Sequence, residues 1–238
     1  IPTIDTELEK LSKNVNVFKE IGTDILVSSL DTVKIAQNKL ETYKFFKSMG
    51  LNTPTTYGKN DNYDGGYPCF IKPLSGSSSI NAFKVSNERE FEFFKYYIGE
   101  YVIQDFIEGE EYTIDVLCNF DGKPIYITPR IRLATRSGEV IKTKIVNDEK
   151  LIGDTKRIIE ALKPNGPITI QAIHNKIDKK YYFIEINVRF GGGCPLSMMA
   201  GADMAGAIYD LLLGKCIEFS PYAAQEGLVF LRFDQSIC

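Results

Sequence analysis

The chain contains 238 residues, of which 44% are hydrophobic and 25% charged, and these values are ordinary for a globular enzyme with one large core or two lobes. The formal net charge of −3 gives no electrostatic basis for binding nucleic acid, and no apolar run reaches membrane-spanning length, so we expect neither partner. Five scattered cysteines without a CxxC pair argue against structural zinc and fit reduced thiols in a cytoplasm, while a single histidine, His174, disfavours histidine-dependent triads.

The first predicted element is a helix over residues 32–48. Apolar side chains recur there at helical spacing, Asp31 is a suitable N-cap, and Gly50 closes the helix. Lys39 lies at the edge of the apolar stripe, so its ammonium group can leave the packed face.

The rest of the chain alternates between strand and helix patterns. Strands are expected at 67–72, 101–107, 111–119, 125–133, 168–173 and 181–189, and helices at 88–98, 148–162 and 197–213. The last two strands form a hairpin. This mixture predicts an α+β (mixed α/β) fold in which helices cover antiparallel sheets.

Lys72 ends an apolar strand and is followed by a loop of small residues. The loop contains Ser75, Gly76, Ser77 and Ser78. Small residues let backbone N–H groups approach phosphate oxygens closely, and the lysine supplies positive charge. The order is not that of a GxxxxGK[ST] loop, because the lysine precedes the glycine. The alternative is a flexible surface turn beside a lysine that reaches solvent.

Three polar side chains alternate with apolar ones in the strand that ends at Arg189. Ile184, Ile186 and Val188 share one face, which leaves Glu185, Asn187 and Arg189 on the other. If the hairpin register places Gln171 near Glu185, three oxygen-bearing side chains converge. Such a set, completed by water and nucleotide phosphates, would bind magnesium. The alternative is a solvated polar strand face with a salt bridge.

Residues 104–111 lead from one strand into the next through an acidic turn. The backbone of Gln104 and Asp105 could bind a planar base, with Phe106 and Ile107 as an apolar wall. Glu111 could accept a hydrogen bond from a ribose hydroxyl group. An acidic hairpin tip without a ligand is the alternative.

Two arginines and a run of glycines suggest a site for an anionic substrate. Arg130 and Arg132 alternate along one strand, so both face the same side, and arginine suits bidentate contact with a carboxylate. The glycines at 191–193 allow close backbone approach to an anion. The alternative is that both arginines form only surface ion pairs.

The order and spacing of these motifs resemble the ATP-grasp enzymes, particularly those similar to the large subunit of carbamoyl-phosphate synthase. The resemblance runs from about Asp31 to Gly214. It implies two α+β lobes whose antiparallel sheets grip ATP. On this basis residues 1–30 are the remnant of a preceding Rossmann-like domain, 31–103 the first lobe, and 104–238 the second lobe with the metal site.

The resemblance also implies a role for each motif. Lys39 and Lys72 would contact the ATP phosphates. Adenine would contact Gln104, Asp105 and Ile107, and the ribose would contact Glu111. Magnesium would be bound by Gln171, Glu185 and Asn187. Arg189, with Lys72, would stabilise the transferred phosphate or the acyl phosphate. The chain departs from many members at Gln104, where they have Glu, and at Val188, where they have Pro.

The function implied is that of an ATP-dependent ligase. ATP would activate a small-molecule carboxylate as an acyl phosphate, which an amine or another nucleophile then attacks. The alternatives are phosphorylation of bicarbonate or carbamate, and an ATP-binding module without catalysis. We expect ATP and Mg2+ as cofactors and a cytoplasmic location, and a homodimer is one assembly that we consider.

Overall fold

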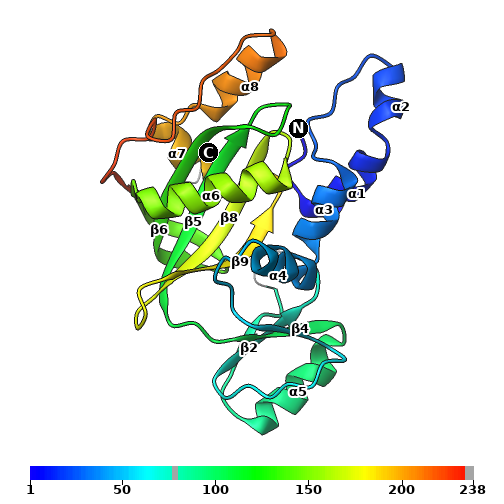
Figure 1. The fold of residues 1–238 in the computed structure, drawn as a ribbon, viewed down its shortest axis with the longest axis vertical. Coiled ribbons are helices and arrows are strands. Elements are labelled where there is room, and N and C mark those ends of the chain that lie inside the picture. Colours follow the sequence, from blue (N-terminus) through cyan, green and yellow to red (C-terminus); the bar gives the residue numbers. More distant parts are fainter. Residues whose placement is uncertain (77–79, 234–238) are drawn as a thin grey trace, which may run out of the picture.

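The computed structural model describes residues 1–76 and 80–233 and contains two antiparallel sheets (Figure 1). The smaller sheet has the order β1-β4-β2-β3, and the larger one the order β10-β7-β6-β5-β8-β9. Helices cover these sheets, which confirms the predicted α+β fold class.

The small sheet is built from short strands and packs against one helix. Its strands are β1 (Thr56–Gly58), β2 (Cys69–Pro73), β3 (Phe83–Val85) and β4 (Tyr101–Asp105), and the helix is α5 (Glu88–Ile98). Ile71 and Ile103 pack against Phe91 of α5 in a separate hydrophobic cluster. β1 and β3 were not predicted, because three residues are too few to show an alternating pattern.

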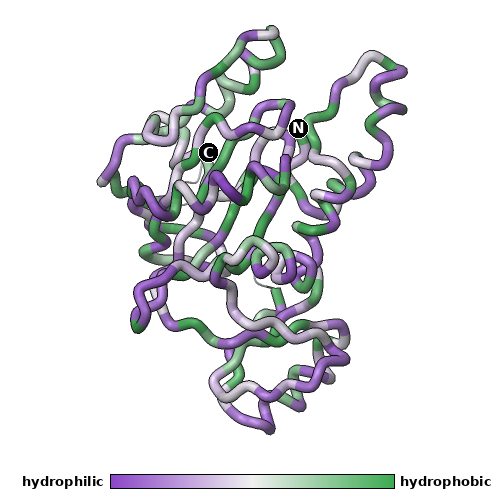
Figure 2. The backbone as a smooth tube through the Cα atoms, in the orientation of Figure 1, coloured by the Kyte–Doolittle hydropathy of each residue, from purple (hydrophilic) through white to green (hydrophobic). Residues whose placement is uncertain are grey.

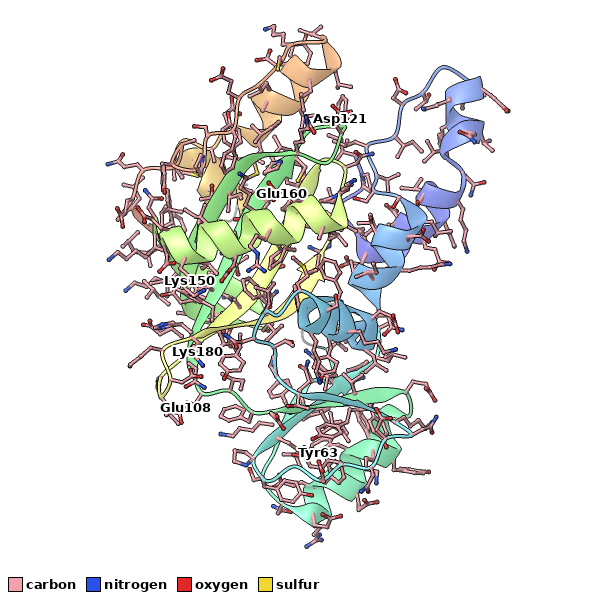
Figure 3. All side chains as sticks on the ribbon, viewed as in Figure 1. Tyr63, Glu108, Asp121, Lys150, Glu160 and Lys180 are labelled. Carbon is pink, nitrogen blue, oxygen red and sulfur yellow. The ribbon has the colours of Figure 1, made fainter. Side chains whose placement is uncertain are left out.

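One face of the large sheet is apolar, and the other carries a polar row beside a second hydrophobic cluster with α7 (Cys194–Met199) and α8 (Met204–Leu212). The strands of this sheet are β5 (Gly109–Cys118), β6 (Pro124–Arg136), β7 (Glu139–Ile145), β8 (Pro167–Asn175), β9 (Tyr181–Asn187) and β10 (Val229–Leu231). α6 (Glu149–Leu162) lies across the apolar face (Figure 1), while Lys150 and Glu160 point outward from it (Figure 3). Figure 2 shows hydrophobic residues along the central strands, whereas hydrophilic residues prevail in the outer turns.

The predicted helix over residues 32–48 is two helices, α3 (Leu30–Gln37) and α4 (Lys39–Ser48). Asn38 breaks the helix: its backbone is extended, and its side-chain oxygen accepts hydrogen bonds from the N–H groups of Leu40 and Glu41. Asparagine is a strong N-cap, so this local bond competes with continuation of the helix. Ser29, not Asp31, caps α3.

Both helices pack on the large sheet beside β9, although they precede the small sheet in sequence. Val33 and Ala36 of α3 and Phe46 of α4 belong to the main core, where the rings of Phe46 and Phe183 are 5.5 Å apart. The break at Asn38 therefore lies beside the large sheet.

The N-terminal segment also joins the main core. It forms α1 (Asp5–Lys13) and α2 (Val15–Glu20), and Leu8 and Val27 are buried with the large-sheet residues. At the other end, the single helix predicted over 197–213 is divided into α7 (Cys194–Met199) and α8 (Met204–Leu212). Gly201 has φ +124° in the turn between them, a value that L side chains rarely adopt.

Candidate active site

A row of polar side chains crosses the large sheet on the face opposite α6. In the strand register, Arg130 of β6 pairs with Thr113 of β5, Thr113 with Gln171 of β8, and Gln171 with Glu185 of β9. Directly paired residues point to the same face of a sheet, so the four side chains are neighbours. The register thus brings Gln171 beside Glu185, which is the condition on which the predicted magnesium site depended.

Glu185, Asn187 and Arg189 form a hydrogen-bonded series along β9. The Asn187 amide donates to Glu185 Oε1 at 3.0 Å, and Arg189 Nη2 donates to Asn187 Oδ1 at 3.2 Å. Ile184 does not join Ile186 in the core, because a bulge opposite Gln171 and Ala172 displaces it. Ile184 instead lines the same cavity as Glu185, so the expected strict alternation was wrong at this residue.

The predicted magnesium ligands supply one carboxylate and two amides. Among residues 1–76 and 80–233, no group of three or more His, Cys, Asp or Glu side chains comes together as a metal site. Magnesium commonly takes one or two carboxylates and completes its shell with water and substrate phosphates. Glu185, with the amide oxygens of Gln171 and Asn187, fits this pattern provided that phosphates lie next to it.

A cavity of ≈420 Å³ is lined by residues of both sheets. It contains most of the residues predicted to bind nucleotide or metal: Lys39, Lys72, Ser75, Gly76, Gln104, Asp105, Phe106, Ile107, Glu111, Gln171 and Glu185. The predicted contacts Ser77 and Ser78 lie outside the described residues. The volume lies within the range of small-molecule and cofactor sites. We refer to this space as the nucleotide cavity.

Two lysines provide positive charge in the nucleotide cavity. Lys72 is 8% exposed, and burial lowers the pKa of its ammonium group to about 8, an effect partly offset by the charge of Glu185. Burial also lowers the pKa of Lys39, whose Nζ donates to the carbonyl of Gly76 at 2.9 Å. A bound anion would favour the charged form of both side chains.

The segment that links the two sheets supplies backbone and an apolar wall. The Gln104 side chain is buried and donates to Thr56 Oγ1 at 2.8 Å, so it anchors β1. Lys84, which the sequence did not single out, lies 4.0 Å from the centre of the Phe106 ring. It comes from the unpredicted strand β3, and a lone lysine between Phe83 and Val85 carries no signal of this contact.

A smaller cavity of ≈120 Å³ adjoins the nucleotide cavity and is lined by Arg130, Arg132, Arg189 and the glycines at 191–193. The two cavities share Arg132, Gly138, Gln171 and Glu185. The structure therefore brings the predicted acceptor residues together, next to the proposed metal ligands. We call this space the acceptor cavity.

Arg130 is the most buried cation of the acceptor cavity. Its side chain is 2% exposed and its Nε donates to Asp115 Oδ2 at 2.7 Å, which also accepts from Ser197 Oγ at 2.7 Å. In the described part of the chain its Nη1 is buried without a hydrogen-bond partner. A Cβ atom on Gly193 would collide with this guanidinium group, so the close approach requires glycine.

Arg132 lies between the two cavities. Its Nη2 donates to the carbonyl of Gly138 at 2.7 Å, and its Nη1 is 3.6 Å from Glu111 Oε2. Its Nε, like Arg130 Nη1, is buried with no hydrogen-bond partner among the described residues. A buried unpaired N–H group costs free energy, so an anion in the acceptor cavity would be stabilised by these donors.

Arg189 has a partner that no sequence pattern indicated. Its Nε and Nη2 donate to Asp5 Oδ2 at 2.8 and 2.5 Å, and its Nη1 donates to the carbonyl of Phe190. Gln37 at the end of α3 donates to the Asp5 carbonyl and so holds the start of α1 at the site. Asp5 and Arg189 are 184 residues apart, so only the tertiary fold reveals this pair.

A family model described as the ATP-grasp domain matches residues 36–193, and the chain therefore belongs to the ATP-grasp family. Enzymes of this family use ATP and Mg2+. The structure contains no helix in its described residues that is long and apolar enough to cross a membrane.

Curated relatives of the chain are D-alanine–D-alanine ligases. The enzyme of Fusobacterium nucleatum is 31% identical over 99 residues, which are 42% of this chain and 32% of that protein. The enzyme of Rickettsia akari is 25% identical over 212 residues, which are 79% of this chain and 65% of that protein. The chain thus spans from about a third to just under two thirds of the length of these relatives.

A solved structure with a similar fold is the biotin carboxylase domain of 2-oxoglutarate carboxylase from Hydrogenobacter thermophilus, in complex with MgADP, ADP and bicarbonate. It aligns with a TM-score of 0.75 at 16% identity and covers 93% of this chain and 55% of that one. At this identity the likeness shows the fold.

Proposed function

We propose that the protein is an ATP-dependent ligase that activates a small carboxylate and joins it to an amine. The observation that carries this proposal is the adjacency of the two cavities. The cavity with Lys39 and Lys72 meets a cavity with three arginines, and Glu185 and Gln171 line both. A phosphate donor on one side and an anionic acceptor on the other would meet at the metal ligands.

Residues of the nucleotide cavity would bind and orient ATP. Lys39 and Lys72 would contact phosphate oxygens, the backbone at Asp105 to Ile107 would contact adenine, and Glu111 would accept from ribose. Gln171, Glu185 and Asn187 would hold magnesium, which when bound neutralises phosphate charge. Phosphoryl transfer depends mainly on such positioning and charge, so no nucleophilic side chain is required.

Residues of the acceptor cavity would orient the carboxylate. Arg130 Nη1 and Arg132 Nε are buried donors without partners in the described part of the chain, and both belong to side chains that line this cavity. Backbone N–H groups of Gly191 and Gly192 could add further donors. Arg189 would stabilise the charge that develops as the phosphoryl group reaches the acid. This set suits a small acid.

The names of the curated relatives support an amino acid as the acid. A second candidate is bicarbonate, because the acceptor cavity has a volume of only ≈120 Å³. A bicarbonate-phosphorylating enzyme would release phosphate with bicarbonate alone, whereas a ligase of amino acids would respond to a particular amino acid.

The test is phosphate release from ATP by this chain, measured with a panel of D- and L-amino acids, other small acids and bicarbonate. We expect release to depend on one class of acid and on Mg2+, and to stop with excess EDTA. Equal release with every acid, or none with any acid from a protein that binds ATP, would reject the ligase proposal and favour a module that binds ATP without catalysis.

The division of the chain into lobes is also part of the proposal. We propose that ATP binds between a first lobe, residues 31–103, and a second lobe, residues 104–238. Support comes from the lining of the nucleotide cavity, to which α4 and β2 contribute from the first range and β5, β8 and β9 from the second. The boundary between residues 103 and 104 cuts β4, and α3 and α4 pack on the large sheet. Residues 1–30 are proposed to belong to a preceding domain, although α1 reaches the site through Asp5.

A further inference from the structure

A third cavity opens on the side of the acceptor cavity that faces away from the nucleotide cavity. Its volume is ≈490 Å³, and it shares Glu139, Arg189, Gly191 and Gly192 with the acceptor cavity. None of the described residues that line it also lines the nucleotide cavity. The three spaces therefore follow one another, with the acceptor cavity in the middle.

The walls of the third cavity are apolar with two carboxylates. Ile4 at the start of α1, Phe190, and Pro195 and Met198 of α7 provide the apolar surface. Asp5 and Glu139 provide the carboxylates. Glu139 is paired with Arg232, whose Nη1 lies 3.2 Å from its Oε2, so Asp5 is the carboxylate that could hold a cationic end once Arg189 moves. A molecule with a small apolar body and a cationic end would match these walls.

The ion pair between Asp5 and Arg189 lies where the third cavity meets the acceptor cavity. Arg189 lines both spaces, and its Nε and Nη2 are engaged by Asp5. An anion in the acceptor cavity would compete with Asp5 for these donors. The Asp5 side chain is only 17% exposed, so a carboxylate that lost Arg189 would need another cation to offset its lost hydration.

We propose that the third cavity binds the amine substrate, a primary amine with a small uncharged apolar body, and that its ammonium group pairs with Asp5 when Arg189 turns toward the activated acid. The ammonium then loses a proton to the Asp5 carboxylate. The neutral amine attacks the carbonyl carbon of the acyl phosphate, the C–O bond to the phosphate breaks, and phosphate leaves as the amide forms. The inference rests on the proposed ligase function and adds the place and the chemical class of the second substrate. The exchange makes amine binding dependent on acid binding, because the acid releases the Asp5 carboxylate. It also separates the amine from ATP by the acceptor cavity.

The test compares two nucleophiles in the presence of ATP, Mg2+ and the acid identified by the phosphate-release screen. Hydroxylamine is small and uncharged at neutral pH, so it can trap an activated acid as a hydroxamate without an ammonium site. The probe for the third cavity is n-butylamine, measured by formation of its amide. The alcohol n-butanol, tested as a competitor of n-butylamine, has the same apolar body without the charge.

Asp5→Asn removes the charge and retains the shape of the side chain. We expect it to raise the KM for n-butylamine about tenfold or more, while hydroxamate formation falls about threefold or less. The matched control is Glu7→Gln, the same change in the same first turn of α1 but at an exposed position. It should alter neither reaction, and n-butanol should compete poorly with n-butylamine in the unmodified protein.

Three results would overturn the inference and leave the ligase function standing. Equal losses of hydroxamate and amide would mean that Asp5 only positions Arg189. An unchanged KM for n-butylamine would mean that the amine does not meet Asp5. Effective competition by n-butanol would mean that charge is not recognised. A protein that forms no hydroxamate with any acid would instead reject the ligase function, and the inference with it.

Discussion

Lys72 and Arg130 are both buried cations of the candidate site, but the fold holds them in opposite ways. Arg130 has its counterion inside the protein, since Asp115 lies 2.7 Å from its Nε and is itself held by Ser197. Lys72 has neither an ion pair nor a side-chain hydrogen bond to any residue of 1–76 or 80–233, and burial lowers the pKa of its ammonium group.

The difference separates a cation that the folded protein satisfies from one that a ligand must satisfy. Burying an unpaired charge costs free energy, and the free protein bears that cost at Lys72. An ATP phosphate would offset this cost, because it would give the Lys72 ammonium group the ionic contact that the free protein lacks. Arg130 keeps only Nη1 unpaired, so the acid would contribute one further hydrogen bond to a guanidinium group that is already in place.

The largest effect expected from this comparison is the loss of stability in Arg130→Met. The change leaves Asp115, which is fully buried, without its cation, and breaking a buried pair in this way costs about 3–5 kcal/mol. Urea denaturation measures this loss. The double variant Arg130→Met, Asp115→Leu should recover much of it, and a loss below about 1 kcal/mol in the single variant would show that the pair is not structural.

Lys72→Met should act on binding instead. We expect MgATP affinity to fall by about 2–4 kcal/mol, while the free energy of unfolding of the free protein stays unchanged or increases, since an unpaired buried charge is removed. Calorimetric titration and urea denaturation measure the two quantities. The control is Lys150→Met on α6, where the lysine is exposed (Figure 3) and pairs with Asp154. Normal affinity in Lys72→Met would remove this lysine from the phosphate site.

A third variant, Arg132→Met, tests the arginine that lies between the two cavities. It should raise the KM for the acid by a factor that corresponds to about 1.5–3 kcal/mol of lost binding free energy. This is the range for hydrogen bonds from a charged group. Steady-state phosphate release measures the effect, with the exposed Arg157→Met of α6 as control. If both the KM and the turnover of Arg132→Met match those of the unmodified protein, the acceptor site lies elsewhere.

The smallest expected effect is the pH dependence of nucleotide binding. The pKa of Lys72 is lowered to about 8 in the free protein, so above that pH ATP must bind a neutral amine, or Lys72 must take up a proton from the solvent on binding. MgATP affinity should fall by up to about tenfold for each pH unit above 8. Lys72→Arg should bind ATP without this decline, because arginine stays protonated. A flat profile in the unmodified protein would contradict the assignment.

The free energy of unfolding of the free protein should change with pH in the opposite direction to the MgATP affinity. The unfolded chain binds a proton at Lys72 up to a pKa near 10.5, whereas the folded chain loses it near 8. The unfolded state therefore holds more protons between these values, and the contribution of Lys72 to stability rises with pH across that window.

The sequence alone determined the longer elements of the site and the residue types that they carry. The apolar periodicity of α6 and the strand pattern that ends at Arg189 predict their structures, because one buried face per element leaves a regular signal. The alternation in β9 also placed Glu185 and Asn187 on one face. These local rules require only neighbouring residues.

The tertiary structure decided what lies opposite each of those residues. The bulge that turns Ile184 into the nucleotide cavity, the Asp115 partner of Arg130 and the Asp5 partner of Arg189 all depend on contacts between distant segments. Asn38 could either continue the first helix or act as the N-cap of a second one. Packing beside the large sheet favours the N-cap, so the break depends on tertiary contacts. Strand pairing and long-range ion pairs leave no periodic mark in the sequence, so only the folded chain reveals them.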